Sequence, residues 1–293
     1  MSSLLLHSVS YAGFWGQATL DVHRFVEKAA ELGFDGVELM AKRPHVSALD
    51  WDAAACAALR EKIDKLGLRD TCLAGYVNLT GDLEHGEMPH REINVTYLAA
   101  LCRLARDLGA SSVRIFTGYE SAAASPGAQW RLIVDSLREA ADQAGRYGVR
   151  LGVQNHHDIA VGYESFHDLI AEVNHTHCRA MFDAWAPALH GADLRTAARK
   201  LAPMTIHTTV ADYQLRPRYR YQPALVNYEV QTPATVAVPM GEGFIDYGAF
   251  FGGLRDGGFA GSIAYEMCSP LRDGASMDVL DRYARGFLAY MRA

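Results

Sequence analysis

The chain has 293 residues, which fits two ordinary domains or one large α/β barrel and is long enough to bury a full core. Its 28 Lys and Arg stand against 34 Asp and Glu, a net charge of −6, and no basic run could neutralise a phosphate backbone, so we expect no nucleic-acid partner. No stretch approaches the ~20 apolar residues of a membrane-spanning helix, so we expect no membrane contact.

The five cysteines are an odd number without C-x-x-C spacing, which argues against a disulfide framework and against a structural zinc site. Residues 1–16 have few apolar residues in a row and no basic start, so no secretory signal is expected there. Both observations predict a reduced protein of the cytoplasm.

A strand-like run, "LLLHSVSYA", opens the chain at residues 4–12. Five later segments share one layout, in which an amphipathic stretch ends at glycine and an apolar β-type run follows: "ELGFDGVELM", "KLGLRDTCLAG", "DLGASSVRIF", "RYGVRLGVQN" and "DGGFAGSIAYE". Glycine permits the left-handed cap that ends a helix, and a β-branched run suits a strand buried on both faces. The glycines at 33, 67, 109 and 148 are spaced by about one strand plus one helix.

Two further runs, "CRAMFDAWAP" and "MTIHTTVAD", complete eight predicted strands. Helices are predicted near residues 20–33, 51–66, 89–108, 127–147, 164–173, 192–201, 246–256 and 276–292. This alternation predicts one α/β domain over residues 1–293, a closed (β/α)8 or TIM barrel. A doubly wound open sheet is the alternative, disfavoured because no G-x-G-x-x-G follows any strand.

Residues 213–240 interrupt the alternation with three prolines before Pro239 and a cluster of Arg and Tyr. The segment is too long for a plain connection, so we expect an inserted loop over one barrel mouth. A lid, a subunit contact and a solvated surface loop are all open interpretations. Arg216 in this loop is a candidate substrate contact.

Polar side chains lie at the ends of four consecutive predicted strands. Gln154 and His156 end the fifth strand, and Asp183, His207 and Glu266 end the sixth, seventh and eighth. Chemistry in such barrels sits at the carboxyl ends of strands. A single buried Asp or His is more often a hydrogen-bonded structural group, but four strands with ligand types at one end predict a mixed N/O site for Mn²⁺, Mg²⁺, Co²⁺ or Zn²⁺.

The chain resembles the xylose isomerase-like TIM barrels, which include sugar phosphate isomerases, tagatose and psicose epimerases and inosose dehydratases. The resemblance covers almost the whole chain and rests on "ELGFDGVELM", "QNHHD", "FDAW", "IHTTVADY" and "MGEGFIDYGAFFGGLRDGGFAGSIAYE". It implies a divalent metal, Mn²⁺ first, bound where the family has Glu, Asp, His and Glu, on Gln154, Asp183, His207 and Glu266. It also implies a sugar isomerase or epimerase that removes a proton beside a metal-bound carbonyl.

Gln154 departs from the family pattern at the first glutamate. An amide can offer its oxygen to a metal but cannot exchange a proton near neutral pH, which argues against a symmetric two-glutamate mechanism. Glu266 and His156 remain as catalytic candidates. His156 shares a strand face with Gln154 and titrates near physiological pH, although it can instead serve only to bind substrate.

Three further residues are candidate substrate contacts. Trp185, two residues after Asp183, has the flat apolar face that stacks on a sugar, and it can equally be a packing residue. His7 and Glu38 end the first and second strands and can contact hydroxyl groups.

Three functions compete. The first is the metal-dependent isomerase or epimerase, acting on a small sugar as a homo-oligomer. The second is a lyase that cleaves 3-keto-glycosides or C-glycosides by α-proton removal and β-elimination, which needs one base; some such relatives work with a small β-rich subunit. The third is a sugar-binding barrel without catalysis.

Overall fold

Eight parallel strands form a nearly closed barrel, in the order β6-β5-β4-β3-β2-β1-β10-β7. The computed structural model describes residues 2–83 and 86–293, so positions 1, 84 and 85 of the predicted domain lie outside the description. An isolated parallel bridge between Ala180 and Thr205 joins the two ends of the sheet. The predicted α/β barrel is confirmed, with strands β1 (Leu4–His7), β2 (Gly36–Met40), β3 (Asp70–Ala74), β4 (Ser112–Ile115), β5 (Arg150–Gln154), β6 (Cys178–Met181), β7 (His207–Val210) and β10 (Ser262–Tyr265).

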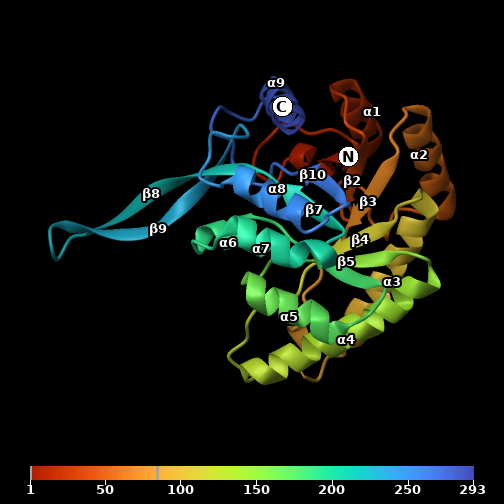
Figure 1. The fold of residues 1–293 in the computed structure, drawn as a ribbon, viewed down its shortest axis with the longest axis horizontal. Coiled ribbons are helices and arrows are strands. Elements are labelled where there is room, and N and C mark those ends of the chain that lie inside the picture. Colours follow the sequence, from red (N-terminus) through yellow and green to blue (C-terminus); the bar gives the residue numbers. More distant parts are fainter. Residues whose placement is uncertain (1, 84–85) are drawn as a thin grey trace.

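Helices cover the outside of the barrel (Figure 1). Each helix predicted from the sequence is present, and the short α6 is additional. The helices are α1 (Val22–Leu32), α2 (Ala53–Lys65), α3 (His90–Leu108), α4 (Pro126–Arg146), α5 (Tyr163–Val173), α6 (Trp185–Leu189), α7 (Leu194–Leu201), α8 (Tyr247–Asp256) and α9 (Met277–Arg292), with 3-10 turns η1 (Ser8–Tyr11), η2 (Gly81–Leu83) and η3 (Ala202–Met204). Among the described residues, none of these helices is long and apolar enough to cross a membrane.

Local signals set the helix ends. The side chain of Asp21 accepts hydrogen bonds from two backbone N–H groups at the start of α1, and Ser125 caps α4 in the same way with one. Gly33 and Gly109 follow α1 and α3 with φ of 90° and 76°, the left-handed region that glycine adopts without strain. The glycine pattern therefore marks helix ends as the sequence predicts.

The interior of the barrel contains a small apolar cluster and a group of buried polar side chains. Leu5, Cys72 and Ala264 form the apolar cluster. His207 is the first residue of β7, so the prediction that it ends this strand is wrong. It belongs to a buried layer of charged and imidazole groups, each at most 2% exposed, made of His7, Glu38, Arg114 and His207. Because buried charges need partners, this layer determines how the residues at the barrel mouth are arranged.

The segment expected as an inserted loop is an ordered antiparallel hairpin of β8 (Asp212–Gln222) and β9 (Asn227–Val238), which projects far from the barrel (Figure 1). The prolines of this segment disfavour strands, which is why the sequence predicted a loop here. Pro217 lies at the register shift between Arg216 and Arg218, where the ladder is already interrupted. Proline, which has no N–H to donate, is tolerated at such bulges.

The base of the hairpin is anchored to the barrel. The Asp212 carboxylate, in a residue only 1% exposed, accepts hydrogen bonds of 2.9 Å from the backbone N–H groups of Gly241 and Gly243. The ring of Tyr213 packs 4.2 Å from that of Trp185. The proximal end of the hairpin is thus part of the barrel wall, whereas its distal part is exposed.

The close approach of β2 to β3 gives a test of the barrel. A methyl group at Gly36 would clash with the backbone carbonyl of Asp70, so we expect Gly36→Ala to lower the free energy of unfolding by about 1–3 kcal/mol. Nothing lies within 4 Å of a methyl group added at Gly286 in α9, so Gly286→Ala should raise it by up to about 1 kcal/mol. Urea denaturation of both variants measures the difference; equal effects would contradict the strand packing.

Candidate active site

The carboxyl ends of the barrel strands surround a cavity of about 740 Å³. Its size lies within the range of small-molecule sites. Aromatic rings form much of its wall: Phe14, Trp15, Tyr76, Phe116, Tyr119, Trp185, Tyr213 and Tyr247. Charged and hydrogen-bonding side chains complete it, among them Lys42, Arg114, Gln154, Asn155, His156, Asp183, Thr209 and Glu266. Flat apolar walls around a polar floor suit a small polyhydroxylated molecule.

The structure brings five of the residues predicted from the sequence to this cavity: Gln154, His156, Asp183, Trp185 and Glu266. They come from the ends of β5, β6 and β10 and from the start of α6. The carboxyl ends of parallel strands meet at one end of a barrel, which is why residues so far apart in sequence converge here.

His7, Glu38 and His207 lie inside the barrel instead, outside the residues that line the cavity. The Nε2 atom of His207 lies 3.1 Å from Oε2 of Glu38, and that of His7 lies 3.7 Å from Oε1 of Glu38. His7 Nε2 also lies 3.5 Å from Oε1 of Glu266. These three residues therefore form a buried layer that supports Glu266 from below.

Arg216 is exposed on β8 and is not among the residues that line the cavity. It lies on β8 of the hairpin, which projects from the barrel (Figure 1). The structure does not bring this predicted substrate contact together with the other site residues.

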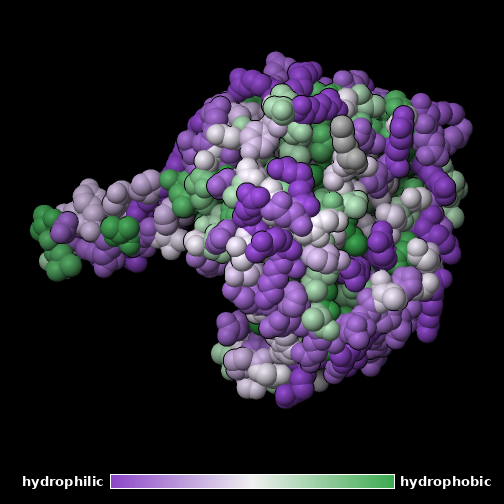
Figure 2. Space-filling view, viewed as in Figure 1, coloured by the Kyte–Doolittle hydropathy of each residue, from purple (hydrophilic) through white to green (hydrophobic). Residues whose placement is uncertain are grey.

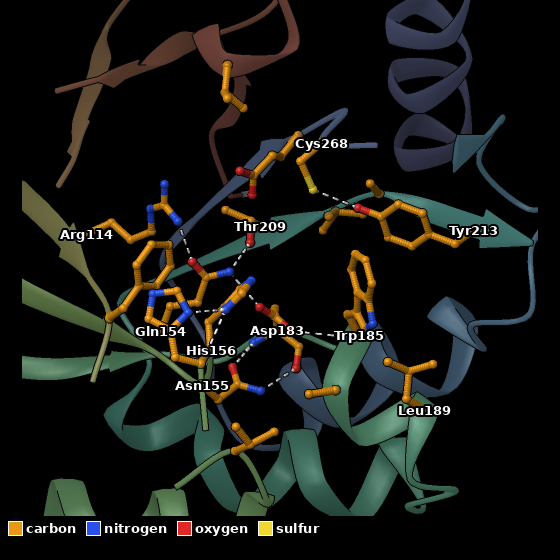
Figure 3. Close-up of a pocket in the computed structure, with 18 of the residues that line it drawn as sticks. Arg114, Gln154, Asn155, His156, Asp183, Trp185, Leu189, Thr209, Tyr213 and Cys268 are labelled. Carbon is orange, nitrogen blue, oxygen red and sulfur yellow. Dashed lines mark hydrogen bonds between the residues drawn. The ribbon is translucent and has the colours of Figure 1, made fainter. Parts of the chain in front are cut away.

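Gln154 lies at the centre of the polar floor (Figure 3). Its Oε1 accepts a hydrogen bond of 2.7 Å from Nη1 of Arg114. Its Nε2 donates to Oδ2 of Asp183 at 2.6 Å and to Oγ1 of Thr209 at 3.0 Å. A guanidinium can only donate and an ionised carboxylate can only accept, so these neighbours permit a single orientation of the amide.

Asp183 is held by hydrogen bonds on both sides. Its Oδ1 accepts from the backbone N–H of Trp185 at 3.0 Å, while Oδ2 accepts from Gln154. Asn155 accepts from the backbone N–H of Asp183 at 2.8 Å and donates to its carbonyl. Burial raises the pKa of Asp183 to about 6, although the hydrogen bond from Gln154 opposes the shift.

Glu266 carries the carboxyl group best suited to exchange a proton near neutral pH. Burial raises its pKa to about 7, while the nearby charge of Arg114 opposes this rise. Its side chain is 13% exposed and faces the cavity. A base with a pKa near the working pH has both a useful ionised fraction and a useful proton affinity.

The pKa of His156 differs from that of an ordinary histidine. Its ring lies 4.9 Å from that of Phe116, and its Nδ1 accepts the backbone N–H of His157 at 2.7 Å. Burial among the groups of the barrel mouth, together with the charges of His157 and Arg114, lowers its pKa to about 4. His156 is therefore neutral at pH 7 and a weaker base than Glu266.

Two residues that were not predicted from the sequence also belong to the site. Arg114, 1% exposed, places its Nε 3.3 Å from Oε1 of Glu38 and its guanidinium carbon 4.5 Å from the Phe116 ring centre. Its signal in the sequence is a lone charge in the apolar run "SSVRIF". Thr209 follows His207 by two residues, and alternation puts both on the inner face of β7.

Among the described residues, side chains that can bind a metal lie both inside the barrel and at its mouth. Glu38, Cys72 and His207 bring one ligand atom each within 4.8 Å of one another, a trio that could hold an ion. Both oxygens of Glu38 already face His207 and Arg114, however, and burial raises the pKa of the Cys72 thiol well above its ordinary value. At the mouth, the predicted ligands Asp183 and Glu266 face the cavity, while His207 is engaged with Glu38.

A sequence profile of the xylose isomerase-like TIM barrel family matches residues 26–283. The chain belongs to this family. Among proteins of curated function, no sequence match is found for this xylose isomerase-like barrel.

Solved structures resemble this barrel over almost their whole lengths. D-psicose 3-epimerase from Clostridium cellulolyticum H10 has a TM-score of 0.76 at 17% identity, with 99% of this chain and 98% of that chain covered. The 3-keto-D-glucoside 4-epimerase from E. coli has 0.73 at 18%, covering 100% and 99%. A probable 3-DHS dehydratase from Bacillus anthracis has 0.72 at 17%, covering 98% and 99%. At these identities the likeness establishes the fold.

The raised pKa of Glu266 has a consequence for stability. The pKa of this carboxyl is about 7 in the folded chain, compared with an ordinary value of 4.5. The contribution of this group to stability is therefore present below pH 4.5 and is lost as pH rises through 7. Glu266→Gln removes the cost of the buried charge. We expect it to raise the free energy of unfolding at pH 8 by more than about 1 kcal/mol and to change little at pH 5.

Urea denaturation at the two pH values measures this effect. The matched control is Glu120→Gln, at an exposed position near the barrel mouth, which should change stability equally at both pH values. A Glu266→Gln chain that is less stable than wild type at pH 8 would show that the ionised carboxylate is well accommodated.

Proposed function

We propose that this barrel is an enzyme that removes a proton from the carbon beside the carbonyl group of a ketose or keto-sugar, with Glu266 as general base. The observation that carries the proposal is the Glu266 carboxyl, which faces the cavity with its pKa raised by burial to about 7. Structural neighbours named as D-psicose and 3-keto-D-glucoside epimerases support the substrate class.

The other residues receive roles from their positions in the cavity. Arg114 can stabilise negative charge that develops on the carbonyl oxygen as the proton leaves. Trp185 supplies a flat face that can stack on a sugar ring. Asn155 holds Asp183 in place by hydrogen bonding to its backbone. His156 offers a neutral imidazole that can hydrogen-bond a substrate hydroxyl group. In isomerisation Glu266 returns the proton to the neighbouring carbon of the same substrate, whereas epimerisation also needs a proton donor on the opposite face of the carbon that lost its proton.

A lyase is the second candidate, and one specific observation favours it. Gln154 cannot exchange a proton, so Glu266 is the carboxyl group with a pKa near 7 and no second glutamate faces it from β5. One base is sufficient to remove an α-proton and expel a group from the β-carbon of a keto-glycoside. The likeness to a probable dehydratase, which bears an elimination reaction in its name, is consistent with this alternative.

The Mn²⁺ predicted from the family resemblance does not enter these steps. Asp183 and Glu266 face the cavity as carboxyl groups, but Gln154 presents amide hydrogens towards Asp183, and His207 is bound to Glu38. This set does not match the donors of a divalent-metal site. The proposed chemistry therefore assigns every proton and hydrogen bond to side chains of the chain itself.

Replacing Glu266 tests the proposed base. We expect Glu266→Gln to slow exchange of the substrate α-hydrogen with solvent deuterium by about 10²–10⁴-fold, the usual contribution of one general base. The wild-type rate should rise with pH through about 7, because the base must be ionised. Proton NMR in deuterium oxide with a panel of ketoses and 3-keto-glucosides measures both, and two products identify the lyase.

The matched comparison is His156→Ala, which should cost less than Glu266→Gln because the pKa of His156 is only about 4. A larger loss in His156→Ala would reassign the base. A chain that binds a sugar from the panel without any exchange would instead be the sugar-binding barrel of the third hypothesis.

We infer that the hairpin binds a second copy of this chain. Residues that are paired directly across a two-stranded ribbon lie on the same face of it. One face of the hairpin carries two such pairs of apolar or aromatic residues, each residue 47–77% exposed: Tyr219 with Val230, and Tyr221 with Tyr228. Figure 2 shows hydrophobic residues at the tip of this projecting arm. The hairpin carries three arginines against two acidic residues, whereas the whole chain has a net charge of −6, so the arm and another copy's barrel attract each other.

Changing the apolar face of the hairpin tests this homo-oligomer. We expect wild type to be dimeric or larger by analytical ultracentrifugation and Tyr219→Ser with Val230→Ser to be monomeric, because the buried apolar area is lost. The matched control, Gln222→Ser with Asn227→Ser, changes a pair on the other face and should leave the assembly intact. A monomeric wild type would reject the second copy and favour a different subunit as the occupant.

A further inference from the structure

The amide group of Gln154 points the wrong way for a metal ligand. Its oxygen faces Arg114, and its nitrogen donates to Asp183 at 2.6 Å and to Thr209 at 3.0 Å. Rotating the amide would set its nitrogen against the guanidinium and its oxygen against the carboxylate, with no hydrogen bond on either side. An ion beside Asp183 would therefore face the two N–H bonds of the Gln154 amide instead of its oxygen.

The imidazole expected in the ligand set is also displaced. His207 lies in the layer of Glu38, at 3.1 Å, and the position of β7 level with Gln154 is occupied by Thr209. A neutral hydroxyl group is a much weaker ligand than imidazole for Mn²⁺, Co²⁺ or Zn²⁺. Two carboxyl groups remain, and both oxygens of Asp183 already accept hydrogen bonds from the protein.

A positive charge is already present at this place. The guanidinium of Arg114 cannot be deprotonated in a protein, is 1% exposed and lies between Glu38 and Gln154 on the floor of the cavity. Its faces lie against Phe116 and Tyr76, with the guanidinium carbon 4.5 and 5.2 Å from the ring centres. A divalent ion bound next to it would be repelled at short range in a medium of low dielectric constant.

The geometry points to a barrel in which Arg114 replaces the divalent metal ion as the positive charge of the active site. The guanidinium pairs with the buried carboxylate of Glu38, orients Gln154 and faces the cavity, so the site has a positive charge without an ion. The role of Arg114 in stabilising a substrate oxygen rests on the proposed function. Its exclusion of a metal ion does not depend on that function. Arg114 is charged at every pH at which the chain is folded, so the charge of the site does not depend on metal supply.

Metal binding to the wild-type chain tests the replacement without any substrate. After treatment with a chelator and dialysis, Mn²⁺ is titrated and the free ion is followed by electron paramagnetic resonance. We expect no stoichiometric binding at the site up to about millimolar Mn²⁺, the weak end of affinities for oxygen-ligand sites. Binding that persists unchanged in Asp183→Asn and in Cys72→Ser lies elsewhere on the surface and agrees with the proposal.

A variant that rebuilds the ligands provides the positive result. Arg114→Met with Gln154→Glu and Thr209→His removes the cation and supplies a carboxylate and an imidazole, and should bind one Mn²⁺ per chain at least about tenfold more tightly than wild type. Gln154→Glu alone is the matched control. Its new carboxylate remains beside Arg114, so we expect it to pair with the guanidinium and stay free of metal.

One Mn²⁺ or Co²⁺ per wild-type chain, lost in Asp183→Asn, would overturn the proposal. So would an ion lost in Cys72→Ser, with the thiolate-to-cobalt absorption that marks a sulfur ligand, because it would place a metal on Glu38, Cys72 and His207. These readouts contain no sugar, so they can fail while the exchange experiment on Glu266 succeeds, and the reverse.

Discussion

The hydrogen bond between Arg114 and Gln154 is the constraint on which the site depends. A guanidinium buried to this degree carries a large desolvation cost unless anions, hydrogen-bond acceptors or aromatic faces surround it. The barrel provides all three, in Glu38, in the Gln154 oxygen and in Phe116. Because the Gln154 amide oxygen accepts a hydrogen bond from Arg114, the amide nitrogen must face Asp183. The buried charge of Arg114 therefore determines which hydrogen-bond donors and acceptors face a substrate.

The fold could be predicted from the sequence because its signals are local. Helix ends are marked by caps such as Asp21 and Gly33, and buried parallel strands read as short apolar runs between them. The hairpin was predicted only as a loop, because its prolines suggest irregular backbone and its apolar residues have no core to face within the chain. Pro217 is accommodated by a register shift, which a single sequence does not reveal.

The site was predicted in part, and the differences have a common cause. Gln154, Asp183 and Glu266 end their strands, so their convergence follows from the parallel barrel alone. His207 and Thr209 both face inwards from β7, and the choice between them depends on the stagger of β7 against its neighbours, which local sequence does not encode. Arg114 lies earlier along its strand, and it reaches the cavity floor because its side chain is long.

The hairpin has a further consequence for colloidal behaviour. A two-stranded ribbon has two open edges, each with backbone groups that can recruit another strand and extend into an aggregate. The register shift at Pro217 twists one edge and removes a donor, and Arg218 and Arg220 on the same strand repel identical ribbons that approach edge to edge. In the proposed assembly the aromatic face of the arm binds the second copy, while its edges are protected from the repeated strand addition that builds fibres.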